Sequence, residues 1–474
     1  MNNSMILLEF NELVPRLMND FIEAGHLPSF ARLREESQCF ITDAGEAPPN
    51  LEPWIQWITV HSGLTASEHS VFNLGDSRSV SKDAIWDVAS QHHQRVWVCG
   101  SMNAFYRPGI NGWVLPDPWS IQVAPNSEEL KPYLDFVRSQ VLEYTRAESR
   151  YKLAEAAPFV RFMLSHGLRM KTCVSIIGQL LRERFEDIRW RRPTILDRLQ
   201  FDLFRYVYRN ERPILSTFFL NSTAHFQHCY WRNLEPEAFS ISPDADDQAL
   251  HEDAILFGYK SMDRIVGEVF EMAGDRAVIV LASALSQQPC LKYEESGGKT
   301  FYKPEAYSAL LRAVGLDGRD CTVEPVMSEQ FHLRFRSNAD AADAVAKFEA
   351  ATVDGRPVFS CERNGSSLIV GCAIFSELRS DATFVSPVGK HRFFDLFYGV
   401  DTRKSGMHHP DGLLWIRIPE KPGRLHENRV PLVNVAPTLL ALLGLPVPAS
   451  MSGRSLFPNT ENHEVARNAR ASGF

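Results

Sequence analysis

The sequence predicts an α/β fold with a central, mostly parallel sheet, a helical insertion and a small α+β subdomain. Short apolar runs, typical of buried parallel strands, alternate with amphipathic helical patterns along most of the 474 residues. Two blocks, 126–212 and 319–376, interrupt this alternation with patterns of their own. The core therefore comprises three separate parts, expected over 1–125, 213–318 and 377–460.

The N-terminal part begins with the apolar run MILLEF at 5–10, which predicts the first buried strand. A helix should follow over 14–24 and end at Gly25. A Pro-rich loop covers 46–53, and the segment WIQWITVHSG after it predicts a second helix. The run RVWVCG at 95–100 predicts another buried strand.

The block 126–212 carries long amphipathic patterns and many charges, so we expect a helical insertion or cap. After it, the runs ILSTFFLN and AVIVLAS predict strands at 214–221 and 277–283, separated by a helix over 249–273. Ligands of parallel α/β sheets bind beyond the carboxyl ends of the strands. The polar segments EFNE, FLNSTAH and LASALSQQ should therefore converge at one edge.

The block 319–376 alternates like a sheet and contains Asn364-Gly365, the strongest short signal for a hairpin turn. It predicts the small α+β subdomain. The last core helix lies in PLVNVAPTLLALLGLP, and the polar residues 461–474 should form a flexible tail.

Composition excludes several classes of protein. A formal net charge of −8 argues against a general nucleic-acid binder. The eight cysteines include no C-x-x-C pair and are too few for a disulfide scaffold. We find neither a signal-peptide pattern nor a run of about 18 apolar residues. We therefore expect a cytoplasmic chain with a small-molecule substrate and no nucleic-acid or membrane partner; a homo-oligomer stays open.

Six segments resemble, in order, motifs of the alkaline phosphatase superfamily, most closely its type I phosphodiesterase/nucleotide pyrophosphatase branch. They are the opening strand with EAGHLPSFARL, then WITVHSGLTASEHSVFNLG, FLNSTAHFQHCYWR, VIVLASALSQQP, GMHHPDGLLWI and VNVAPTLLALLGLPVPASMSGRSL. The resemblance implies an alkaline phosphatase-like sandwich and a hydrolase. It also implies two divalent metals, usually zinc, held by Asp and His beside a Thr or Ser nucleophile.

This sequence departs from that metal pattern. Asn11, Ala224 and the pair Ala284-Leu285 stand where the resemblance implies ligands, and Glu52 stands at the nucleophile position. His228 and His409 remain as the ligands if zinc is bound. We therefore expect no cofactor and a degenerate, metal-independent site.

The polar residues that remain suggest carboxylate chemistry on a small polar substrate such as a glycoside or sugar-phosphate derivative. In this hypothesis Glu52 is the nucleophile or base, and Glu9 or Glu12 is its acid partner. The residues expected to bind the substrate lie in the same motifs: Asn11, Asn50, Trp54, Gln56, His69, Asn103, His225, His228, Arg232, Ser286, Gln287, Gln288, His409 and Asp411.

Other interpretations stay open. Glu52 before a helix is also typical of an N-terminal cap or a partner of the helix dipole. Trp54 and the two histidines at 225 and 228 also suit core positions. The alternatives for the whole chain are a metal-dependent phosphodiesterase and a catalytically silent binding protein.

Overall fold

A computed structural model describes residues 4–74, 76–143, 153–296, 298–325 and 330–457. The expected tail 461–474 lies outside these residues. Among the described residues, no helix combines the length and apolarity that crossing a bilayer requires.

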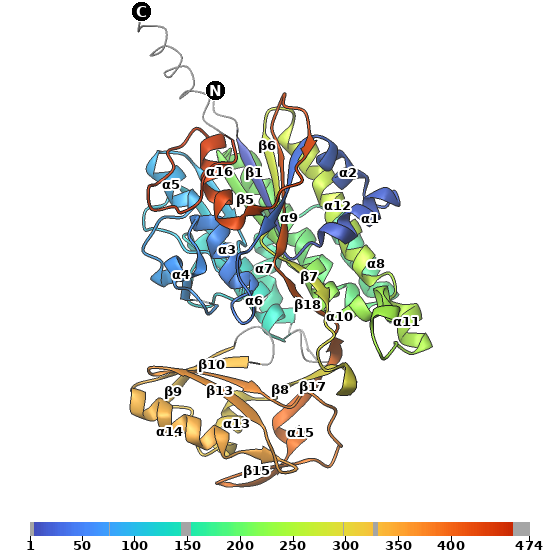
Figure 1. Cartoon of the computed structure of the whole chain (residues 1–474), viewed down its shortest axis with the longest axis vertical. Helices are drawn as coiled ribbons and strands as arrows, with labels where there is room; N and C mark the ends of the chain where they lie inside the picture. Colours follow the sequence, from blue (N-terminus) through green and yellow to red (C-terminus); the bar gives the residue numbers. More distant parts are fainter. Residues whose placement is uncertain (1–3, 75, 144–152, 297, 326–329, 458–474) are drawn as a thin grey trace, which may run out of the picture.

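A nine-stranded sheet forms the centre of the larger body in Figure 1, in the order β20-β2-β19-β6-β1-β5-β3-β4, with β21 beside β2. The strand β1 runs parallel to β5 and β6, while β19 is antiparallel to both β6 and β2. The predicted α/β class with a mostly parallel central sheet is confirmed. The strands are β1 (Met5–Phe10), β2 (Ser37–Asp43), β3 (Val96–Cys99), β4 (Gly112–Leu115), β5 (Leu215–Leu220), β6 (Val278–Ser283), β19 (Asp411–Arg417), β20 (Arg424–Leu425) and β21 (Val430–Pro431).

Helices cover both faces of this sheet, and alternate residues of β1 point to opposite layers. Ile6 and Leu8 join one hydrophobic core, whereas Met5 and Leu7 join the other. The first core packs against α1 (Pro15–Glu23), α2 (Pro28–Glu35), α9 (Pro193–Glu211), α10 (Ser222–Leu234) and α12 (Ala254–Ala273). The second packs against α3 (Pro53–Ser62), α5 (Ile85–Gln91) and α16 (Val435–Leu442).

The described residues of the block 126–212 are mostly helical, as its amphipathic pattern predicts. It contains α6 (Lys131–Glu143), α7 (Leu153–Ser165), α8 (Met170–Arg182) and the core helix α9. Buried side chains of α6, α7 and α9, such as Leu134, Phe162 and Phe204, belong to the first core. The block is therefore partly a layer of the core.

The small subdomain lies below the larger body in Figure 1 and has a hydrophobic core of its own. That core extends from Tyr302 to Phe397, so the subdomain is wider than the expected range 319–376. The Asn364-Gly365 turn joins β13 to antiparallel β14, as predicted. Its elements are β8 (Lys299–Pro304), α13 (Tyr307–Ala313), β9 (Cys321–Pro325), β10 (Gln330–Phe335), α14 (Asn338–Glu349), β11 (Thr352–Val353), β12 (Arg356–Pro357), β13 (Phe359–Asn364), β14 (Ser367–Cys372), β15 (Thr383–Ser386), β16 (Gly389–Arg392), α15 (Phe393–Leu396) and β17 (Phe397–Lys404).

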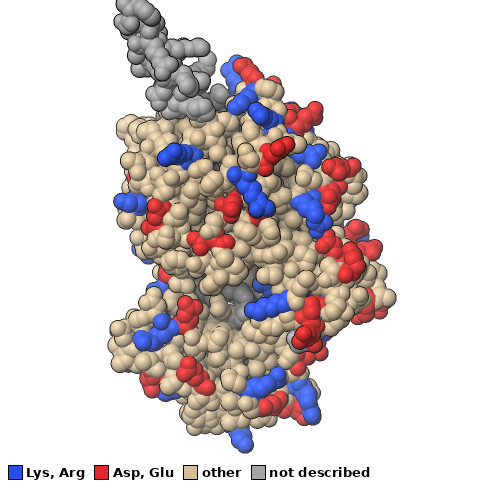
Figure 2. Space-filling model, viewed as in Figure 1, with Lys and Arg blue, Asp and Glu red and all other residues tan. Residues whose placement is uncertain are grey.

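Two antiparallel ribbons connect the subdomain to the core. The strand β8 pairs with β17, and β7 (Ser286–Pro289) pairs with β18 (Gly406–His409). Figure 2 shows a hollow in the surface where the two bodies meet, with Lys, Arg, Asp and Glu interspersed over this face. The second ribbon brings residues from two distant parts of the sequence to the carboxyl edge of the sheet.

Candidate functional site

The site begins at the turn that follows β1. Asn11 is fully buried, and its amide donates to the Glu12 carboxylate and to the side-chain oxygen of Asn221, both at 2.8 Å. The Trp57 indole donates to the Asn11 oxygen at 2.8 Å. Asn11 is thus held by Trp57 of α3 and by Asn221, the residue before α10, and it aligns Glu12.

Glu12 has φ +59°, a left-handed conformation that is uncommon for residues other than glycine. The surrounding core holds this turn in place. The Gln227 amide donates to the Glu12 carbonyl oxygen at 2.7 Å, and the Tyr259 hydroxyl donates in turn to Gln227 at 2.9 Å. The Leu13 amide donates to the Ser283 hydroxyl at 3.0 Å.

The Glu12 carboxylate is the centre of the site. Its Oε2 atom lies 3.0 Å from His228 Nε2 and 3.6 Å from His408 Nε2. The Gln287 amide donates to the same oxygen. These partners come from α10, β18 and β7, so the site joins parts of the chain that are far apart in sequence.

Both imidazoles are oriented by main-chain carbonyl groups. His228 Nδ1 lies 3.0 Å from the Gly406 carbonyl oxygen, and His408 Nδ1 lies 2.9 Å from that of Leu51. Since a carbonyl oxygen only accepts, each Nδ1 donates its hydrogen, and each Nε2 is directed toward Glu12. The ligand atoms of the two histidines and Glu12 lie within 4.8 Å of one another.

The electrostatics keep the Glu12 carboxyl ionised. Burial alone would raise its pKa, but the nearby imidazoles of His228 and His408 and the hydrogen bonds from His228 and Gln287 lower it to about 2. Burial, aided by His228 and Lys404, lowers the pKa of His408 to about 4, although Glu12 opposes this.

Glu52 lies on the far side of His408. It is the residue before α3, and its Oε2 lies 3.4 Å from His408 Nδ1. Its side chain is 29% exposed, whereas that of Glu12 is 3% exposed. His408 therefore stands between a buried carboxylate and a partly solvated one.

Glu9, predicted as an acid partner, is placed elsewhere. Both Glu9 and His61 are fully buried, and Glu9 Oε1 lies 2.7 Å from His61 Nε2. Glu9 alternates with Phe10 along β1 and faces the α3 layer. Glu9 is thus enclosed with His61, and its role as acid partner of Glu52 stays a prediction.

Several other predicted residues form hydrogen bonds at the start of α3 or in the segment after it. The Gln56 amide donates to the Asn50 carbonyl at 3.0 Å, and the Asn103 amide donates to the Trp54 carbonyl at 3.1 Å. The Val71 amide donates to His69 Nδ1 at 3.0 Å.

The remaining predicted residues have other partners than Glu12. Gln288 donates to the His408 carbonyl, and Ser286 is paired with His409 in the β7–β18 ribbon. His225 lies beside Cys229, Arg232 pairs with Glu294, and Asp411 pairs with Arg429.

The sequence-based ligand set contained His409, but the structure brings the adjacent His408 to Glu12. His409 Nδ1 instead accepts from the Asp411 amide at 3.2 Å. Neighbouring strand residues point to opposite faces, so only the pairing of His408 with Gln287 separates the two histidines. The two adjacent histidines in the sequence indicate a candidate ligand, but the sequence alone does not show which of them faces Glu12.

Comparisons with known proteins place the chain near one group of structures. It matches human ectonucleotide pyrophosphatase/phosphodiesterase 5 with a TM-score of 0.44 and 9% identity, over 97% of this chain and 99% of the other. It matches phosphonoacetate hydrolase from Sinorhizobium meliloti 1021, in complex with phosphonoformate, with a TM-score of 0.41 and 11% identity, over 94% and 96%.

A mutant of alkaline phosphatase PafA matches with a TM-score of 0.47 and 11% identity, over 96% of this chain and 98% of the other. These are structural matches to members of the alkaline phosphatase superfamily over nearly the full chain, at low sequence identity. No family model matches the sequence. No curated protein matches it either. At these identities and scores, nothing about reaction or substrate follows from the matches.

Proposed function

We propose that this chain is a hydrolase that acts on a small polar substrate at the carboxyl edge of its central sheet. The observation that carries the proposal is the convergence of Glu12, His228 and His408 on one point. A buried, ionised carboxylate beside two oriented imidazoles is costly to fold and is typical of functional sites. The left-handed conformation of Glu12 supports the same interpretation.

The donor set fits a single zinc ion. One carboxylate and two imidazoles are a common three-ligand set of catalytic zinc, and metal-binding histidines usually donate their other ring N–H to an oxygen acceptor. The bonds from His228 and His408 to main-chain carbonyl groups supply that orientation. When bound, zinc would supply Lewis-acid polarisation of a substrate oxygen.

A second metal does not fit the ligand-like positions named from the sequence. Asn11 already contacts Glu12, Asn221 and Trp57 through its side chain. Ala224 and Leu285 are buried and bring no donor atom. We therefore propose that the chain binds one metal at most. This agrees with the expectation that the two-metal pattern implied by the resemblance is incomplete in this sequence.

Glu52 is the proposed general base. It precedes α3, where the helix dipole favours its ionised form, and it is more exposed than Glu12. In that role Glu52 accepts a proton from the attacking water, and His408 holds the carboxylate toward the site. Gln287, which donates to Glu12, fixes the orientation of the buried carboxylate.

The geometry does not favour the glycoside form of the hypothesis. A glycosidase needs one carboxyl that is protonated at the start of the reaction. The low pKa of Glu12 keeps it ionised, and Glu9 is enclosed with His61. We therefore propose an ester or phosphate-ester bond in place of a glycosidic one.

A metal-free hydrolase is the second candidate, favoured by the position of His408. Its Nε2 faces Glu12 at 3.6 Å and its Nδ1 faces Glu52 at 3.4 Å. In this case Glu52 accepts the proton of the attacking water without a metal, and His408, held between the two carboxylates, orients it.

The adjacent histidines provide a matched test. We expect zinc titrated into the metal-stripped protein to bind once, as measured by calorimetry. His408→Ala should weaken that binding by roughly a hundredfold or more, whereas His409→Ala should leave it nearly unchanged. Equal effects of the two changes would contradict the proposed ligand set, and no zinc binding would favour the metal-free candidate.

Glu52→Gln tests the catalytic part separately. A panel of phosphate and carboxylate esters first identifies a hydrolysed substrate. On that substrate the variant should lose roughly 10²–10⁴ in kcat while it keeps zinc affinity, because it removes a base and no ligand. Full activity of Glu52→Gln would exclude Glu52 as the base. A chain inactive on the whole panel would favour the binding-protein alternative.

A further inference from the structure

The helix α8 (Met170–Arg182) turns its apolar side toward solvent. Four residues at helical spacing form this side, which we call the α8 stripe: Met170, Val174, Ile177 and Leu181, between 52% and 77% exposed. Amphipathic helices of globular proteins normally turn such a stripe toward the core. In α8 this stripe faces solvent.

Polar contacts on the opposite side hold α8 in this orientation. Thr172 is buried, and Ser175 accepts a hydrogen bond from Arg198 of the core helix α9. Just after α8, Glu183 forms an ion pair with Arg192 at 2.7 Å, and its side chain is 5% exposed. The inward side also carries Ile176, which packs against the first core, so rotating the helix to bury the stripe would break both the polar contacts and this packing.

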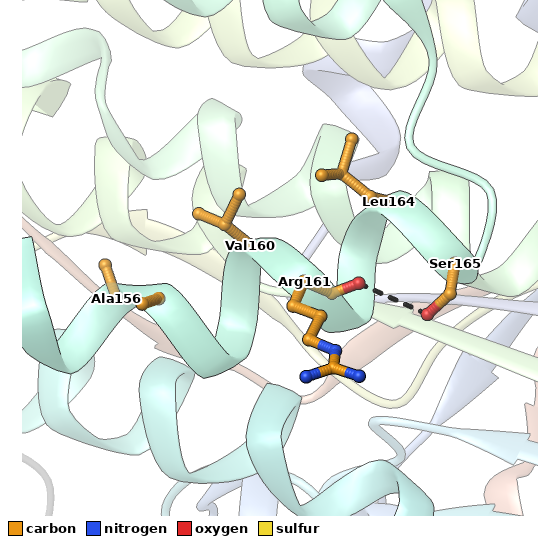
Figure 3. A pocket seen from close by; sticks show the side chains of 6 residues that line it. Ala156, Val160, Arg161, Leu164 and Ser165 are labelled. Atoms are coloured by element: carbon orange, nitrogen blue, oxygen red, sulfur yellow. Dashed lines mark hydrogen bonds between the residues drawn. The ribbon is translucent and has the colours of Figure 1, made fainter.

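Other apolar side chains are exposed on the segments that precede and follow α8 in the sequence. Val160 and Leu164 project from one side of α7, while Arg161 points the other way (Figure 3). These residues line an open, largely apolar hollow of about 590 Å³. Phe185, three residues after α8, is 88% exposed. Large exposed apolar patches on soluble proteins commonly mark sites of interaction with a protein or a membrane.

The charge of this region identifies the kind of partner. Residues 156–192 contain eight Lys and Arg but three Asp and Glu, although the whole chain has a net charge of −8. Lys171 and Arg182 lie on the same side of the stripe, about a quarter to a third of a turn away from it, and they form ion pairs with Glu268 and Glu186. When Glu268 and Asp202, the acidic partners outside this segment, are counted as well, the balance is eight basic to five acidic residues, so an excess of positive charge remains. Positive charge beside an apolar face complements an anionic lipid surface.

We propose that α8 binds the surface of an anionic membrane, with the α8 stripe among the lipid headgroups and acyl chains. Thirteen residues cannot span a bilayer, so the helix would lie in the interface plane. A second copy of the chain fits less well, because a self-complementary contact would bring the two basic regions together. This proposal is independent of the proposed reaction and departs from the sequence-based expectation of no membrane partner.

Vesicle flotation with the full chain tests the proposal. We expect the protein to float with vesicles of phosphatidylcholine and phosphatidylserine, and much less with phosphatidylcholine alone. Added salt should weaken the binding, since part of it is electrostatic. The triple variant Val174→Ser/Ile177→Ser/Leu181→Ser should reduce binding roughly tenfold or more, because it removes most of the inserted apolar surface.

A control triple variant matches these changes in number and exposure at sites outside the helical block: Leu291→Ser, Val388→Ser and Leu425→Ser, which are 53%, 58% and 69% exposed. It should float like the unmodified protein. Equal loss in both triple variants would overturn the proposal, and so would equal flotation with the two kinds of vesicle. A dimer in solution that the α8 variant converts to a monomer would also overturn it, in favour of an interface between copies.

Discussion

Two carboxylates three residues apart, Glu9 and Glu12, both pair with histidine, yet their surroundings differ. Glu9 and His61 are both inaccessible to solvent, and the His61 ring lies 5.7 Å from that of Trp57 and 4.7 Å from that of Trp86. Glu12 is also buried, but the side chain of its partner His228 is 27% exposed. One pair is enclosed by the core, and the other reaches the surface through its imidazole.

The pleat of β1 accounts for this difference. Glu9 lies within the strand and follows Met5 and Leu7 into the α3 layer. Glu12 lies beyond the strand in a left-handed conformation, and its side chain contacts His228 of α10 and His408 of the β7–β18 ribbon. The same chemical pair is thus structural at one position and suited to binding at the other.

The largest expected effect concerns the enclosed pair. Glu9→Ala should lower the free energy of unfolding by roughly 3–5 kcal/mol, because it leaves His61 buried without its partner. Urea denaturation measures the change. The double variant Glu9→Leu/His61→Leu should recover much of this loss, since it removes both polar groups. A loss below about 1 kcal/mol for Glu9→Ala would contradict the claim that the Glu9–His61 pair is structural.

A smaller stability effect is expected at the site itself. Glu12→Gln should cost about 1–2 kcal/mol, because the exposed edge of His228 still reaches water. Its main effect should be on zinc affinity, which should fall roughly a hundredfold or more, as measured by calorimetry. If Glu12→Gln destabilises the fold as strongly as Glu9→Ala does, Glu12 is a structural residue like Glu9.

A third buried carboxylate, Asp197, sharpens the comparison, because it accepts a hydrogen bond from the hydroxyl of Ser222. Burial raises the pKa of Asp197 to about 7, although a hydrogen bond from Ser222 opposes the shift. A carboxyl with a raised folded-state pKa stabilises the fold below its unfolded pKa near 3.8, and this contribution is lost as pH rises through about 7.

Asp197→Asn should therefore become more stable relative to the unmodified protein as pH rises from about 4 to 7. The difference in unfolding free energy should grow by up to about 1.4 kcal/mol per pH unit, the slope for one proton. Denaturation curves at several pH values measure it. A difference that does not change with pH would mean that Asp197 titrates normally in the folded chain.

The shared edge of the sheet could be predicted from the sequence, because parallel strands end on the same side. Asn11 contacts Asn221, and the Leu13 amide contacts Ser283, as the order of apolar strands and polar ends indicates. The choice between His408 and His409 could not be predicted. It depends on a register between β7 and β18, and a shift of one residue exchanges the two faces.

The orientation of α8 could not be predicted from the sequence either. Its periodicity predicts an amphipathic helix, but the apolar side could face either the core or solvent. Ion pairs such as Glu183–Arg192 decide this, and they depend on the tertiary arrangement. The extent of the small subdomain depended in the same way on β8 and β17, which pair across the whole insertion.

The inserted subdomain has a consequence for the order in which the chain folds. Gln287 and His408 meet only when β7 pairs with β18, and the entire subdomain lies between these two strands. An unfolded insertion would make that pairing entropically costly, because a long loop must close. Once β8 and β17 have paired, the two ends emerge side by side and the loop is effectively short. The subdomain should therefore fold before β7 pairs with β18. Destabilising substitutions in the subdomain core should then slow formation of the Glu12 site, although they do not contact it.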